Sequence, residues 1–100
     1  MTMNIPLRTR VLLSVQRALL GEISSAVRHV GVTFDEAEIR LRWVFDGPVS
    51  EADAESASCV ETEVIADMPD HRVVTETVRH DAPKSLAEVR LGESVFARRE

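Results

Sequence analysis

The spacing of apolar positions along the chain predicts a sequence of helices and strands. From Leu7 to about Ile23 apolar residues recur at helical spacing, which predicts a helix with Asn4 as its N-cap and Pro6 in its first turn. Gly21 and the pair Ser24-Ser25 weaken the helical pattern, so we expect the helix to end near Glu22 to Ser25. The predicted apolar stripe consists of Leu12, Val15, Leu19, Leu20 and Ile23.

Two runs of alternating apolar and polar residues follow, joined by the polar tripeptide "DEA" at 35–37. The apolar positions are Val30, Val32 and Phe34 in the first run and Ile39, Leu41, Trp43 and Phe45 in the second. This pattern predicts a β-hairpin in which each strand has one apolar face. We therefore expect a sheet that is covered on one side only.

A second helix is predicted after the turn "DGPVS". Ser50 and Asp53 form a capping box at its start, and Pro69 stops it. Its apolar arc comprises Ala54, Ala57, Val60, Val64, Ile65 and Met68.

The remainder of the chain predicts two more strands. The segment 71–81 is rich in valine and threonine, and 93–100 is predicted as a terminal strand. Between them, Ser85 with Glu88 predicts either one short helical turn closed by Gly92 or a plain loop. The order α-β-β-α-β-β predicts an α+β two-layer sandwich in a single domain, residues 1–100, with two helices on one face of a four-stranded, largely antiparallel sheet.

Composition favours a small globular protein of a reducing compartment. With 44% hydrophobic residues, 100 residues can bury a core without metal or disulfide. Cys59 is the single cysteine, so no intramolecular disulfide can form. No apolar run approaches the roughly 20 residues needed to span a bilayer, and the N-terminal segment lacks the features of a signal peptide. We expect a cytoplasmic protein.

The formal net charge of −5 is distributed unevenly. Residues 1–50 contain six arginines and five acids, whereas residues 51–100 contain six bases and twelve acids. The stretch from Ser50 to Asp70 carries seven carboxylates and no lysine or arginine. Such a segment attracts basic proteins and repels nucleic acid and anionic membranes, neither of which we expect as a partner.

Sequence motifs for common chemistries are missing. The four glycines are isolated, so there is no phosphate-binding loop, and Ser94 lacks the second glycine of a nucleophile elbow. The potential zinc ligands Cys59, His29, His71 and His80 include no closely spaced pair. We expect neither an enzyme nor a cofactor or metal site.

Two side chains on the second helix nevertheless have a chemical interpretation. Glu61 falls inside the apolar arc, where desolvation would raise its pKa and favour a general acid; the alternative is that the helix rolls or that an arginine pairs with it. Cys59 lies among carboxylates, which disfavour a reactive thiolate, so we expect an inert thiol.

A basic sheet surface is a further alternative. Arg40 and Arg42 share the strand face opposite Trp43, and Arg98 or Arg99 could join them. The aromatic side chains lie on the covered side, however, and the pI near 5.2 argues against nucleic acid binding, so we interpret these arginines as solvated surface.

The acids of the second helix are the main candidate binding residues: Glu51, Asp53, Glu55, Glu63, Asp67 and Asp70. Most solvated helix faces mix charges, because Glu–Lys pairs four residues apart support the helix. A surface of one sign accelerates association with an oppositely charged partner. A solubilising face and a docking face for a basic protein both remain open.

Four segments resemble a family of small bacterial proteins: "QRALLGEI" at 16–23, "IRLRWVFDG" at 39–47, "ETEVIADMPDH" at 61–71 and "VFARRE" at 95–100. These proteins are similar to the immunity proteins of contact-dependent inhibition systems. The resemblance implies a protein that binds a toxin domain, often a nuclease, and blocks its active site. It implies no catalytic residues.

Two hypotheses follow. The first is a non-enzymatic inhibitor that binds a basic partner through the acidic helix. The second is a structural or homo-oligomerising domain that pairs through an exposed sheet edge such as the last strand, with the acidic helix serving solubility.

Overall fold

The computed structural model describes residues 5–100, which form two helices and a four-stranded sheet. The helices are α1 (Leu7–Leu19) and α2 (Glu51–Asp67). The strands are β1 (Val27–Phe34), β2 (Glu38–Phe45), β3 (Arg72–Arg79) and β4 (Glu93–Ala97), in the sheet order β3-β2-β1-β4. The predicted α+β class and the order of elements are confirmed.

Helix α1 is shorter than its apolar pattern predicts. Pro6 occupies the N-cap, whereas the predicted cap Asn4 lies outside the described residues. The chain leaves the helix at Leu20 and turns at Gly21, whose φ of 80° favours glycine. Leu20, predicted on the buried stripe, is therefore 78% exposed. The buried residues of α1 are Val11, Ser14, Val15, Ala18 and Leu19.

The predicted β-hairpin is confirmed. Strands β1 and β2 pair antiparallel, with Val30 opposite Trp43 and Val32 opposite Leu41. Asp35 closes the turn, because its Oδ1 accepts hydrogen bonds of 2.8 Å from the backbone N–H groups of Ala37 and Glu38. This Asx-type geometry fixes the register that places the apolar side chains on one face.

The prediction of a largely antiparallel sheet is only partly met, because β2 and β3 run parallel. Helix α2 connects them, so the chain returns along the sheet before β3 begins, and both strands point the same way. Strand β4 then pairs antiparallel with β1 at the opposite edge. The short turn predicted at Ser85 is also present, as the 3-10 helix η1 (Leu86–Glu88), and Gly92 follows it with a φ of 58°.

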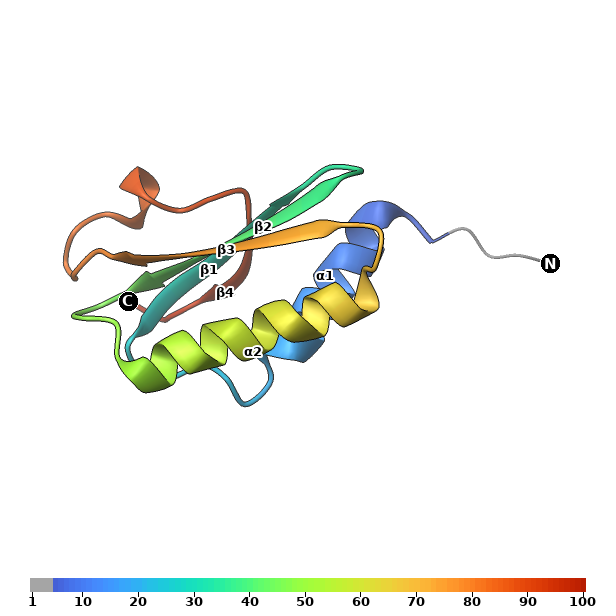
Figure 1. Cartoon of the computed structure of the whole chain (residues 1–100). Helices are drawn as coiled ribbons and strands as arrows, with labels where there is room; N and C mark the ends of the chain where they lie inside the picture. The colour runs from blue at the N-terminus through green and yellow to red at the C-terminus, as the bar shows by residue number, and fades with distance from the viewer. Residues whose placement is uncertain (1–4) are drawn as a thin grey trace.

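Both helices lie on the same side of the sheet, as Figure 1 shows. The core lies between them and the inner sheet face, where Val11 and Val15 of α1 and Val60 and Val64 of α2 join Trp43 in one buried cluster. The Trp43 and Phe45 rings stack at a centroid distance of 6.1 Å.

The outer sheet face is not open along its whole length, which corrects the prediction that only one side is covered. The chain must cross the sheet from β3 to β4 at the opposite edge, and the helices already occupy one face, so residues 80–92 cross the other (Figure 1). Val44 beneath them is fully buried. A Cβ on Gly31 would lie 2.0 Å from the carbonyl oxygen of Leu91, so only glycine fits there.

Candidate functional site

Helix α2 begins as the sequence predicts. Ser50 is its N-cap, and the Ser50 hydroxyl accepts a hydrogen bond of 3.0 Å from the backbone N–H of Asp53. Glu51 and Asp53 lie in the first turn, where negative charge is favourable to the helix dipole. The cap therefore fixes where the acidic segment becomes helical.

The buried stripe of α2 is rotated relative to its prediction. Ala57, Val60, Val64 and Met68 are buried as expected, whereas Ala54 is exposed and Ile65 is 46% exposed. Asp53 is buried in their place, at 8% exposure. Glu61 lies at the margin of the stripe and is only partly buried, so the complete desolvation required by the general-acid hypothesis is not met.

The six predicted binding acids are in three different environments. Glu51, Glu55, Glu63 and Asp70 are exposed. Asp53 is turned toward the protein, which corrects the expectation that it faces solvent. The Asp67 carboxylate accepts hydrogen bonds from the Ser14 hydroxyl (2.8 Å) and from Arg17 Nη2 (3.3 Å) of α1. The exposed negative charge on α2 that Arg17 does not pair is thus carried by Glu51, Glu55 and Glu63, and Asp70 continues it just beyond the helix.

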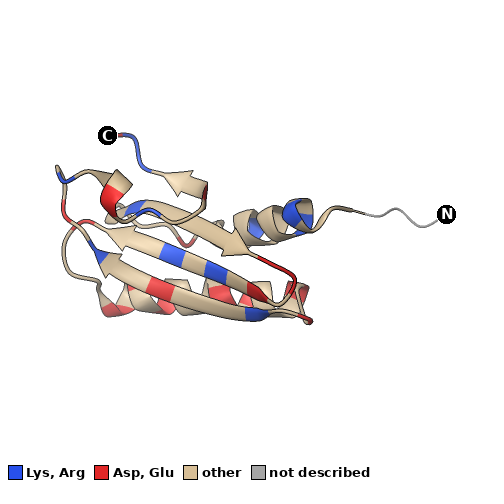
Figure 2. Cartoon of the chain, turned by 90° about the horizontal axis from the view of Figure 1, so that it is seen from above, with Lys and Arg blue, Asp and Glu red and all other residues tan. Residues whose placement is uncertain are grey.

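Helices α1 and α2 lie side by side and carry opposite charges, as Figure 2 shows. Helix α2 contains six acids and no base, whereas α1 contains Arg8, Arg10 and Arg17 and no acid. The Arg17–Asp67 pair joins the two helices near the C-terminal end of α2. Toward the N-terminal end of α2, Glu51 and Glu55 face solvent.

Cys59 is exposed on α2, and its thiol donates to Glu55 Oε1 at 3.8 Å. Desolvation, followed by the negative charges of Glu55 and Glu22, raises the pKa of the Cys59 thiol. A raised pKa keeps the thiol protonated near neutral pH. This agrees with the prediction of an inert cysteine.

Each of the three histidines contacts a different part of the chain. His71 and His80 use Nε2 to contact backbone carbonyls, those of Asp35 (3.2 Å) and Ser85 (3.0 Å). His29 is 2% exposed, its Nε2 lies 2.7 Å from the Ser94 hydroxyl, and burial followed by the charge of Arg90 lowers its pKa. Within residues 5–100, no three His, Cys, Asp or Glu side chains gather into a group that could hold a metal ion.

The arginines on the outer sheet face are paired with acids of the same chain. Arg40 contacts Glu38 (3.0 Å) and Glu76 (3.1 Å), and Arg42 contacts Glu76 (3.3 Å). The hydrogen bond from Arg40 is the largest of the effects that lower the pKa of Glu76. This surface is thus largely neutralised, which leaves α2 as the concentrated charge of the molecule.

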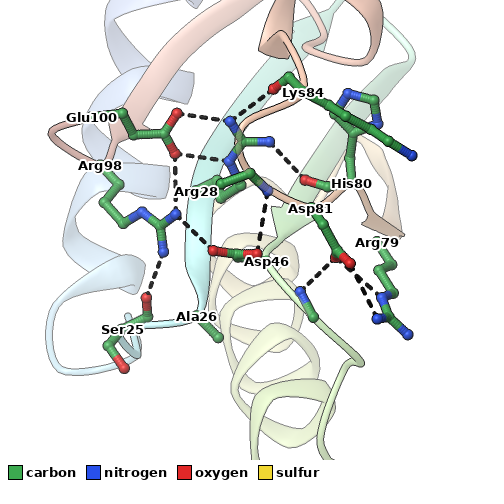
Figure 3. Close-up of polar contacts among 12 residues, drawn as sticks. Ser25, Ala26, Arg28, Asp46, Arg79, His80, Asp81, Lys84, Arg98 and Glu100 are labelled. Carbon is green, nitrogen blue, oxygen red and sulfur yellow. Dashed lines mark hydrogen bonds and ion pairs between the residues drawn. The ribbon is translucent and has the colours of Figure 1, made fainter.

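A buried arginine that no sequence pattern indicated holds the chain segment beyond β4. The guanidinium of Arg28 is 2% exposed and donates two hydrogen bonds of 2.7 Å to the Glu100 carboxylate (Figure 3). It also donates to the carbonyls of His80 (2.6 Å) and Lys84 (2.9 Å). The only sequence sign of this role is a charged residue inside an otherwise buried strand.

Arg98 extends this cluster. Its Nη2 lies 3.0 Å from Asp46 Oδ2 and 3.3 Å from Glu100 Oε2, and its Nη1 donates to the Ser25 carbonyl at 3.0 Å (Figure 3). Each of these charges is matched by an internal partner, so the cluster holds segments together and presents no free group to a ligand.

These features define a small α+β protein with mostly paired charges and one unbalanced acidic helix. The chain belongs to the MafI2 immunity protein family, whose sequence model matches residues 8–100. A comparison with curated proteins found no match. Family membership confirms the resemblance to immunity proteins of toxin systems and indicates a toxin-neutralising role. Within the part of the chain that the structure describes, neither helix is long and apolar enough to cross a bilayer.

Proposed function

We propose that this immunity protein neutralises its toxin by forming a non-covalent complex in the cytoplasm, and that the exposed acids of α2 contact a basic surface of the toxin. The observation that carries the proposal is the charge of α2: six acids and no base in 17 residues, with Glu51, Glu55 and Glu63 exposed. Binding without catalysis is in keeping with an immunity family.

The arrangement of these acids disfavours the isolated helix. Glu51 and Glu55 are four residues apart, as are Glu63 and Asp67, and like charges at this spacing destabilise a helix by about 0.2–0.5 kcal/mol per pair. Arg17 offsets the second pair by binding Asp67. The first pair has no lysine or arginine within α2 to offset it, so a basic partner would relieve its repulsion.

A nuclease is the toxin class that best fits this surface. Nucleases bind the phosphate backbone through lysines and arginines, and a helix with regularly spaced carboxylates presents a similar series of negative charges. Complementary charge raises the association rate and lowers the affinity for wrong partners. An acidic helix seated in such a cleft would exclude the nucleic acid substrate.

The test is charge reversal at two exposed acids. Asp67 is a poor choice, because its substitution would also disturb Ser14 and Arg17. We expect Glu55→Lys combined with Glu63→Lys to lower the association rate with the cognate toxin by about 10- to 100-fold at low salt, measured by surface plasmon resonance. The effect should shrink as salt rises.

The matched control is Glu36→Lys with Glu88→Lys, which changes the net charge equally in the hairpin turn and in η1. We expect this control to alter the rate by less than about threefold, which separates a local contact from net charge. Equal rates for the two double variants would exclude α2 as the docking surface.

A further inference from the structure

One edge of the sheet carries an apolar groove. In the sheet of the described residues β4 is an outer strand, paired with β1 on one side only. Below it, α1 and β4 enclose a groove of about 290 Å³ without a charged lining residue. The groove is lined by Gln16, Leu19, Leu20, Ile23, Val95 and Phe96. Leu20, at its margin, is 78% exposed.

The opposite edge is different. Strand β3 begins and ends with arginines, Arg72 and Arg79, both exposed, and the acidic helix α2 contacts it. Charged side chains at an edge strand discourage pairing with another chain. Pairing through the sheet is therefore more favourable at β4.

We propose that β4 and the adjacent groove form a homodimer interface, in which a second copy of this chain adds its own β4 antiparallel to the first. Self-association at this edge would be a second property of the protein, in addition to the proposed binding of a toxin. The backbone pairing with β1 continues beyond β4, because the Arg98 N–H donates to the Arg28 carbonyl at 2.9 Å. An antiparallel pairing that is centred on Phe96 and includes residues 98 and 99 places Glu93 of each copy opposite Arg99 of the other. An isologous dimer requires this self-complementarity.

The charges near β4 are compatible with this pairing. Arg99 is exposed, and Glu93 retains 39% side-chain exposure while it accepts hydrogen bonds from Arg8. A carboxylate can accept from two guanidinium groups, so Arg99 of the second copy can join Arg8 on Glu93. The two-fold axis also brings the two Leu20 side chains and the two grooves to the same side of the extended sheet, where their burial contributes hydrophobic stabilisation.

The dimer leaves the proposed toxin surface free. Helix α2 contacts β3, at the far edge of the sheet from β4. Each copy of the dimer can therefore bind one toxin. The dimer can be tested without any toxin, so its failure would leave the proposed function untouched.

The experiment is sedimentation equilibrium of the full chain from micromolar to near-millimolar concentration. We expect the average mass to rise from 11.1 kDa toward about twice that value. Leu20→Lys should weaken dimerisation by about tenfold or more, because it places a charge at the apolar seam. The matched control is Leu13→Lys on the same helix, since Leu13 is 51% exposed and lies outside the groove; it should leave the association unchanged.

Two results would overturn the proposal: a wild-type chain that stays monomeric over the whole range, or a dimer that Leu20→Lys does not weaken. Circular dichroism and urea unfolding establish that both variants are folded. Amide hydrogen exchange gives a second readout, because dimerisation through β4 predicts that protection of residues 93–99 increases with protein concentration. Protection that does not change with concentration would likewise exclude this edge.

Discussion

The two flanks of the sheet differ in the kind of side chain that they expose to solvent. The β3 flank, formed by β3 and α2, leaves carboxylates in solvent without basic partners on the same helix. The β4 flank, formed by β4 and α1, leaves apolar side chains in solvent, while Glu93 and Arg98 are held in internal ion pairs. Charge exposed to water acts at long range and governs encounter, whereas apolar surface acts at contact. The contrast is the basis on which we propose a basic toxin as the partner of the β3 flank and a second copy of the chain as the partner of the β4 flank.

Among the substitutions that test this difference between the flanks, we expect Arg28→Met to lower the free energy of unfolding the most. The substitution leaves the Glu100 carboxylate, whose side chain is 30% exposed, and the carbonyls of His80 and Lys84 without their donor. Because each lost hydrogen bond to a charged group contributes roughly 1.5–3 kcal/mol, we expect a total cost of about 3 kcal/mol or more. Urea unfolding measures the loss. Hydrogen exchange should show opening first in residues 80–84 and 98–100, with α2 less affected.

Arg40→Met is the control for this prediction. Arg40 is 39% exposed and pairs with Glu38 and Glu76, and surface pairs contribute about 1 kcal/mol or less. If Arg28→Met and Arg40→Met lower the free energy of unfolding equally, the buried cluster stabilises the β4 flank no more than a surface ion pair does.

A smaller effect is expected from Gly31→Ala. The added Cβ would meet the Leu91 carbonyl oxygen at 2.0 Å, so the crossing segment 80–92 must move away, at a cost of about 2 kcal/mol. Thermal unfolding gives the magnitude, and hydrogen exchange should show the loosening in residues 89–97. Gly47→Ala, which strains a φ of 87° but meets nothing within 4 Å, should cost about 1 kcal/mol and leave β4 protected. Loosening of β4 by both variants alike would show that Gly31 has no special role.

The smallest effect that we expect is on the pH dependence of the free energy of unfolding. The hydrogen bonds from Arg28 are the chief cause that lowers the pKa of Glu100 from its ordinary value of 4.5. A carboxylate with a lower pKa in the folded state stabilises the fold above its unfolded pKa, and this contribution is lost as the pH falls through the folded value. We expect the free energy of unfolding to fall below about pH 4.5, and to fall less steeply in Glu100→Gln. An unchanged pH dependence in that variant would contradict the role of Glu100.

Local sequence patterns predicted much of the fold. The alternation at 30–34 and 39–45 predicted the hairpin, and Ser50 with Asp53 predicted the start of α2, because neighbouring residues decide both features. The end of α1 was misplaced: the apolar pattern continues through Leu20 and Ile23, whereas the backbone turns at Gly21.

Features that depend on distant partners were not predictable in this way. The parallel pairing of β3 is decided by the path of α2 and the core that it buries. The roll of α2, which buries Asp53 and exposes Ile65, depends on packing against the sheet and α1. Arg28 pairs with Glu100, which lies 72 residues later in the sequence, and no local sequence pattern predicts that contact. The acidity of α2 was evident from the sequence, but the pairing of Asp67 with Arg17 required the fold.

The Arg28–Glu100 contact has a practical consequence for the design of fusions and deletions. Residues 98–100 contact three separate segments, because Glu100 accepts hydrogen bonds from Arg28 and Arg98 contacts Ser25 and Asp46. A deletion of only these residues would leave the buried Arg28 guanidinium without its carboxylate although no strand is lost. The hairpin tip around Glu36 is exposed and joins neighbouring strands through a short turn. A reporter inserted there would leave the contacts of residues 98–100 intact.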